Sequence, residues 1–84
     1  MGTTESIRIN CWCFSALVVP LDGGLRVQFD EADWDIIDGY RGLRVVVGRP
    51  GMKDAWMMVA AETRLPPIVW VTLTDARGSV ARAG

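Results

Sequence analysis

Cys11 and Cys13 flank Trp12 in an apolar run, and two nearby thiols can bind a metal ion or form a disulfide. Zinc sites and thioredoxin-like redox centres normally have two residues between the cysteines, which lets both sulfur atoms turn toward one point. Here one residue separates them, and on the predicted strand such residues lie roughly 6.5 to 7 Å apart with parallel side chains. We therefore predict two reduced, core-facing thiols that pack as small apolar side chains. An intersubunit metal site or disulfide is the alternative.

The sequence contains no histidine, which removes the commonest general base and with it Ser-His-Asp and Cys-His catalysis. Lys53 is the single lysine, and it falls in a predicted turn. No glycine-rich phosphate-binding loop of the dinucleotide or P-loop type is present. A tetrahedral metal site within one chain would also lack ligands. We therefore expect a protein that is not an enzyme and that uses no metal or cofactor.

An acidic segment is the strongest positive signal in the sequence. Five carboxylates fall within residues 30–38, and no basic residue lies among them. Ile36 and Ile37 break the alternation of oxygen ligands that an EF-hand calcium loop needs. Such a segment can form an electrostatic footprint for a basic partner, although a solvated helix face is the plainer interpretation. The predicted partner-binding residues are Asp30, Glu31, Asp33, Trp34, Asp35 and Asp38.

The basic residues gather in the other half of the chain. Seven acidic and two basic residues lie in positions 1–38, whereas three acidic and seven basic residues lie in positions 39–84. Arginine and tryptophan on one sheet face could hold phosphates and stack bases. The net charge of −1 and the pI near 5.2 are, however, untypical of a dedicated nucleic-acid module. This alternative site comprises Arg41, Arg44, Arg49, Lys53, Trp56, Arg64 and Trp70.

Length and composition indicate a single small domain over residues 1–84. Half of the residues are hydrophobic and 23% are charged, which is typical of a packed globule. From Ser6 to Val19 we predict one continuous strand whose odd-numbered residues, including both cysteines, face the core. A turn over residues 20–24 leads into a second strand, Leu25–Phe29, which forms a hairpin with the first.

The middle of the chain predicts a helix followed by a strand. Asp30 is a good N-cap for a short helix over Glu31–Asp38, which Gly39 would end in a left-handed conformation. The β-branched stretch Leu43–Val47 predicts a strand, and the Pro-Gly pair at 50–51 predicts a chain reversal.

Residues 54–64 are ambiguous, because alanine, methionine and glutamate favour a helix whereas the preceding Pro-Gly turn favours a hairpin strand. We expect a strand over Ala55–Ala61 and retain a second helix over 54–64 as the alternative. A strand over Ile68–Thr74 and a flexible tail over 76–84 complete the chain. The predicted fold class is α+β, with a mainly antiparallel sheet of four to five strands and one short acidic helix.

Together these features predict a non-enzymatic module that binds another protein. We expect a small inhibitor, such as a phage or mobile element carries, that engages the basic surface of a nucleic-acid-handling complex through the acidic helix. The alternatives are a nucleic-acid-binding module and a structural subunit that associates with itself as a homodimer, since four tryptophans are many for so short a chain. No apolar run is long enough to cross a bilayer and the N-terminus lacks the features of a secretory signal, so we expect a cytoplasmic protein without membrane contact.

Overall fold

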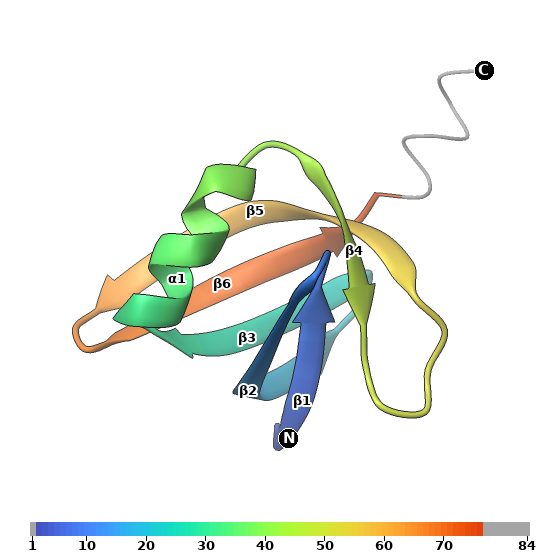
Figure 1. Ribbon diagram of the computed structural model, residues 1–84, viewed down its shortest axis with the longest axis horizontal. Coiled ribbons are helices and arrows are strands. Elements are labelled where there is room, and N and C mark those ends of the chain that lie inside the picture. The colour runs from blue at the N-terminus through green and yellow to red at the C-terminus, as the bar shows by residue number, and fades with distance from the viewer. Residues whose placement is uncertain (1, 77–84) are drawn as a thin grey trace.

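The computed structural model describes residues 2–76, and this part of the chain forms a closed barrel of six strands with one short α-helix (Figure 1). In chain order the elements are β1 (Thr3–Ile9), β2 (Trp12–Leu21), β3 (Gly24–Asp30), α1 (Glu31–Ile37), the 3-10 helix η1 (Asp38–Tyr40), β4 (Arg44–Gly48), β5 (Ala55–Leu65) and β6 (Ile68–Asp75). Neighbouring strands are antiparallel and follow the order β1-β2-β3-β6-β5-β4, with β4 returning to β1. Two three-stranded meanders therefore meet along two seams, β3 with β6 and β1 with β4.

This architecture corrects the predicted α+β sheet of four to five strands. The described chain has one strand more than the upper estimate, and the sheet curls until its outer strands β1 and β4 pair. That seam is short, with Arg8 opposite Gly48 and Ile9 opposite Val47. Pairing between residues about 40 positions apart leaves no local pattern in the sequence, so closure could not be read from periodicity.

A two-residue reversal at Asn10 and Cys11 is the source of the additional strand. Ile9 at the end of β1 pairs with Trp12 at the start of β2, so two residues lie between the strands. Asn10 has a φ of 55°, in the left-handed region that asparagine tolerates better than most residues. The single strand predicted over Ser6–Val19 is therefore two antiparallel strands.

The reversal also changes which residues face the core. Residues directly opposite each other in a hairpin share one face, so the pairing of Ile9 with Trp12 turns odd positions of β1 and even positions of β2 inward. Cys11 and Cys13 are consequently exposed. The prediction of core-facing thiols is wrong, because it assumed one continuous strand. The buried side chains of this hairpin are Ile7, Ile9, Phe14, Ala16 and Val18.

Asn10 also forms hydrogen bonds across the seam between β1 and β4. Its backbone N–H donates to the Val46 carbonyl oxygen at 2.8 Å, and the Val46 N–H donates to Asn10 Oδ1 at 3.0 Å. Both hydrogen bonds extend the seam beyond the residue pairs of the ladder. One residue thus turns the chain and joins the first meander to the second.

Several local predictions are confirmed. The apolar side chains of β3 alternate inward as expected. Asp30 begins α1, where its side chain accepts a hydrogen bond from the Asp33 N–H at 2.9 Å. The Pro-Gly pair at 50–51 reverses the chain with Gly51 at a φ of 72°, and the strand predicted at Ile68 is β6.

The strand predicted over Ala55–Ala61 is confirmed as part of β5, and the alternative of a second helix over 54–64 is wrong. β5 pairs with β4 on one side and β6 on the other, and these ladders outweigh the helix propensity of alanine and methionine. A register shift between Val59 and Ala61 lets this long strand bend around the barrel. Gly39 does not end the helix, since η1 continues the winding and the left-handed glycine is Gly42, at a φ of 81°.

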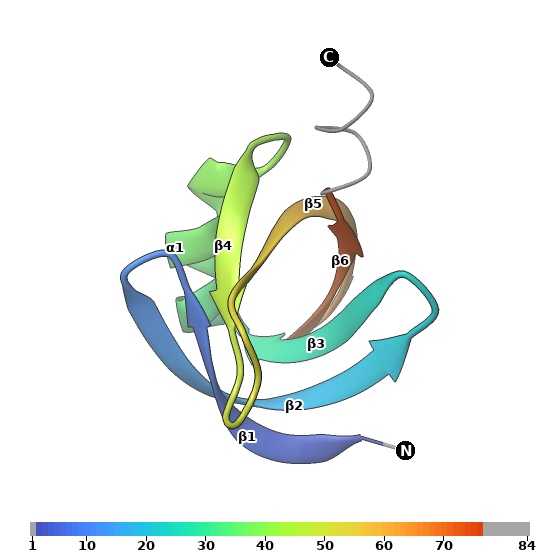
Figure 2. The same ribbon diagram turned by 90° about the vertical axis from the view of Figure 1, so that its right-hand side faces the viewer.

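The two ends of the barrel differ. At the end where β3 finishes, α1 lies against the barrel (Figures 1 and 2). Its Trp34 and Ile37 are completely buried in the core. Beneath α1, Phe14 and Phe29 meet edge to face with ring centroids 5.4 Å apart. The opposite end is ringed by the β2–β3 turn and by the loop between β4 and β5 (Figure 2).

Ala76, the last described residue, is buried and donates its N–H to the Trp56 carbonyl oxygen at 3.0 Å. The rest of the tail predicted over 76–84 lies outside the described residues. Within residues 2–76, no helix combines the length and apolar character needed to cross a bilayer.

We expect Asn10→Ala to lower the free energy of unfolding by about 2 kcal/mol, because alanine lacks the Oδ1 acceptor and disfavours the left-handed conformation. Asn10→Gly retains the backbone conformation and should lose about 1 kcal/mol. Urea unfolding followed by tryptophan fluorescence measures both. Ser15→Ala, at an exposed position of β2, is the control, and an Asn10→Ala variant that is no less stable than this control would contradict the proposed role of Asn10.

Candidate functional site

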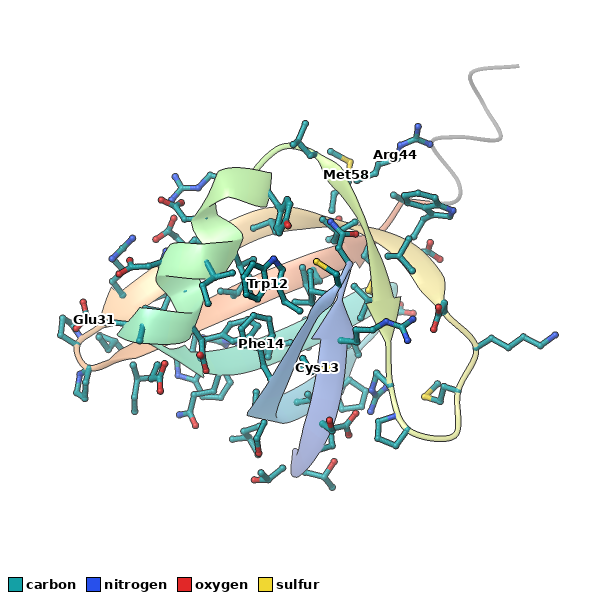
Figure 3. All side chains as sticks on the ribbon, viewed as in Figure 1. Trp12, Cys13, Phe14, Glu31, Arg44 and Met58 are labelled. Atoms are coloured by element: carbon teal, nitrogen blue, oxygen red, sulfur yellow. The ribbon has the colours of Figure 1, made fainter. Side chains whose placement is uncertain are left out.

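The acidic residues predicted to bind a partner lie on the outward side of α1. Trp34 faces the core, whereas Glu31 and Asp35 are exposed and Asp33 is half-buried. Figure 3 shows Glu31 at the outer edge of the helix, where the chain leaves β3. We call these three carboxylates together with the N-cap Asp30 the acidic face.

None of the four carboxylates of the acidic face forms an ion pair within residues 2–76. Asp38, the remaining acid of the predicted site, differs from them. Arg41 contacts both Asp38 and Glu62, and Arg64 binds Glu62 at 2.8 Å. These linked ion pairs lie beside the end of α1. They neutralise the charge of Asp38, so this carboxylate is not available to a partner.

The surroundings of Asp33 disfavour its negative charge. Partial burial raises the pKa of the Asp33 carboxyl, and the neighbouring Asp30 carboxylate raises it further. Both residues line a groove of about 260 Å³ between α1, β2 and β3, to which Thr4, Ser15 and Gln28 add polar side chains. A cationic side chain that entered this groove would meet two carboxylates and several neutral hydrogen-bond acceptors.

Trp34, also predicted to bind the partner, holds the helix on the barrel. Its side chain is fully buried, and the Arg41 guanidinium lies 5.7 Å from its ring centroid. Within the described part of the chain, Trp34 Nε1 has no hydrogen-bond partner, which is unfavourable but outweighed by the large apolar area that the ring buries. Trp34 therefore positions the acidic face and does not reach the surface.

The residues of the alternative nucleic-acid face are not brought together. Arg41 and Arg64 belong to the ion pairs beside α1. Arg49 donates from Nε and Nη2 to the two carboxylate oxygens of Glu5 at 2.7 and 3.1 Å, which lowers the pKa of Glu5 and raises that of Arg49. Lys53 lies in the loop at the open end of the barrel. These cations are therefore separated and mostly neutralised.

Two pairs of arginine and tryptophan lie on the outer surface. The Arg44 guanidinium is 5.6 Å from the Trp56 ring centroid, and that of Arg26 is 4.8 Å from the Trp70 ring centroid. Trp70 lies opposite Thr63 in β5, seven residues from Trp56, so the two tryptophans are roughly 20 Å apart along the sheet. Arg26 is not among the residues predicted for this face, because only the pairing of β3 with β6 brings it to Trp70.

The two cysteines lie on the β1–β2 hairpin as free, exposed thiols. Trp12 between them is 42% exposed, and its Nε1–H donates to the Tyr40 hydroxyl at 3.1 Å. In the part of the chain that the structure describes, no three potential metal ligands gather. Cys11 and Cys13 therefore belong neither to the core nor to a metal centre built by the described residues of one chain.

Comparisons with known proteins give no functional assignment. A scan against protein families, a search of curated proteins and a search of solved structures found no match. The geometry and charge of the acidic face are therefore the features that point to a function.

We expect both thiols to react with Ellman's reagent in the folded protein, at rates within about tenfold of a small free thiol, because both side chains are exposed. The number of reactive thiols should not rise when urea unfolds the chain. Labelling that requires unfolding would show that the reversal at Asn10 and Cys11 does not turn the cysteines outward.

We expect Asp33→Asn to stabilise the protein at pH 7 by about 0.5 kcal/mol. A raised pKa means that the folded state disfavours the Asp33 carboxylate relative to the unfolded chain. The penalty is therefore present above the folded pKa and disappears below the ordinary value, where both states are protonated. Urea unfolding should show the gain at pH 7 and its loss near pH 3. The exposed Asp35→Asn is the matched control, and equal stability of Asp33→Asn and Asp35→Asn at pH 7 would contradict the prediction.

Proposed function

We propose that this protein is a non-enzymatic binding module whose acidic face engages the basic surface of a partner protein. The distribution of ion pairs is the observation that carries the proposal. Within residues 2–76, Arg8, Arg41, Arg49 and Arg64 are each paired with a carboxylate of the same chain. The acidic face is left unpaired, so its charge is available to another molecule.

A row of like charges on one short helix is suited to recognition. The carboxylates of the acidic face repel one another in the free protein, and a cationic partner removes this repulsion. Their field extends over about 8 Å at physiological ionic strength, which steers a basic partner toward the helix and speeds association. Asp33 adds to this field although its surroundings disfavour the charge, as expected for a residue kept for binding rather than for stability.

The groove beside α1 can accept one cationic side chain of the partner. One arginine or lysine of the partner would enter between Asp30 and Asp33, while Glu31 and Asp35 meet cations on the partner's surface. A protein surface that binds nucleic acid presents cations that contact the phosphates. The carboxylates of the acidic face would take the place of those phosphates. The proposed partner is therefore a basic protein of a nucleic-acid-handling complex, which the module would inhibit by covering that surface.

A second candidate function rests on the pair formed by Arg44 and Trp56. Trp56 is 50% exposed, and Arg44 has no acidic partner within the described residues. An exposed tryptophan beside an arginine could stack on a base or pack against another protein surface. The site is small, however, because the other predicted cations lie elsewhere.

Binding should be lost when the acidic face is neutralised. We expect the triple variant Glu31→Gln, Asp33→Asn and Asp35→Asn to weaken partner binding by about 1 to 3 kcal/mol and to flatten its salt dependence. Asp30 is retained, because it caps α1. Affinity capture from nuclease-treated bacterial lysate with quantitative mass spectrometry identifies the partner, and titration calorimetry at several salt concentrations then measures the loss.

The matched control is the double variant Arg44→Gln and Trp56→Ala, which should bind the partner as the parent protein does. A triple variant that retains the partner at full affinity would refute the proposal. Recovery of nuclease-sensitive nucleic acid that only the double variant loses would move the site to Arg44 and Trp56.

A further inference from the structure

The end of the barrel opposite α1 contains a cavity of about 280 Å³. Its lining residues come from β2 and β3 beside their turn, from the loop that joins β4 to β5, and from the adjoining strand ends. Figure 2 shows the turn and the loop at this end of the barrel. The floor of the cavity consists of the buried core side chains Leu25, Val47 and Met57. We call this cavity the barrel mouth.

The rim of the barrel mouth is also apolar. Leu21 and Met52 line it and are 43% and 59% exposed, and Pro20 and Ala55 are exposed beside them. An apolar hollow with an apolar rim is typical of a ligand site, and the mouths of β-barrels are among the places where small ligands bind.

Two cations and no acidic side chain line the barrel mouth. Arg49 is neutralised by its two hydrogen bonds to Glu5. Lys53 is exposed and forms no ion pair within residues 2–76. Its flexible four-carbon chain allows the ammonium group to move over the opening. The barrel mouth therefore combines an apolar floor with one uncompensated positive charge.

We propose that the barrel mouth binds a small amphipathic carboxylate, of the class of medium-chain fatty acids. The alkyl chain would lie on Leu25, Val47 and Met57, and the carboxylate would lie beside Lys53. The cavity is close to the lower limit of ordinary ligand sites, which suits a chain of about eight carbons. The site lies at the opposite end of the barrel from the acidic face, so it does not depend on the proposed function.

Titration of the full-length, 15N-labelled protein with octanoate tests the proposal. We expect saturable chemical-shift changes at the amides of Gly24, Leu25, Val47 and Met57, with a Kd on the order of 1 mM, as expected for a ligand of about ten heavy atoms. Octanol should bind more weakly, because it lacks the charge, and acetate should leave the spectrum unchanged, because it lacks the chain. Absent, non-saturable or widely scattered shifts would overturn the proposal.

Three variants separate the apolar and the electrostatic parts. Ala55→Phe should fill the barrel mouth and abolish octanoate binding, while Lys53→Glu should raise the Kd for octanoate about two- to fivefold and leave octanol unaffected. Arg44→Gln removes a cation outside the barrel mouth and should change neither Kd. Spectral dispersion shows whether each variant folds. A folded Ala55→Phe that binds octanoate like the parent overturns the site, and a Lys53→Glu without effect overturns its preference for an anion.

Discussion

The paired hydrogen bonds between Asn10 and Val46 close the barrel at its short second seam, between β1 and β4. Their position depends on the reversal at Asn10 and Cys11, which ends β1 where β4 can reach it. The same reversal sets the phase of β2, places Phe14 in the core and turns Cys13 to the surface. Without it, the chain from Thr3 to Leu21 would be one long strand and β4 would have no partner on its second edge.

Closure of the sheet explains how so short a chain protects its strands. An open sheet of this size would leave two edges with unpaired backbone groups, which invite pairing with other chains. The seams of β3 with β6 and of β1 with β4 join these edges within the molecule. One end of the barrel is covered by α1, which inserts Trp34 and Ile37 into the core.

The charged side chains of residues 2–76 lie outside the buried core of the barrel. Within residues 2–76, four arginines are paired with carboxylates, as Arg49 is with Glu5, whereas Arg26, Arg44 and Lys53 form no ion pair. The carboxylates of the acidic face form no ion pair either, because the inward side of α1 is occupied by Trp34 and the outward side meets no arginine within residues 2–76. The barrel thus presents a negative helix at one end and an apolar mouth at the other, which suits two different kinds of ligand.

The sequence by itself determined those features that depend on neighbours in the chain. Asp30 caps α1, β3 alternates, and the reversal at 50–51 forms because a few adjacent residues dictate each of them. The sequence also indicated the row of carboxylates within residues 30–38. Tertiary structure alone decided the closure of the barrel, the pairing that removes Asp38 and Arg41 from the candidate sites, and the barrel mouth. For residues 54–64 the sequence favoured a strand but left a helix open, and the pairing of β5 with β4 and β6 decided between them. Each of these depends on contacts between residues far apart in the chain, for which local propensity and periodicity carry no signal.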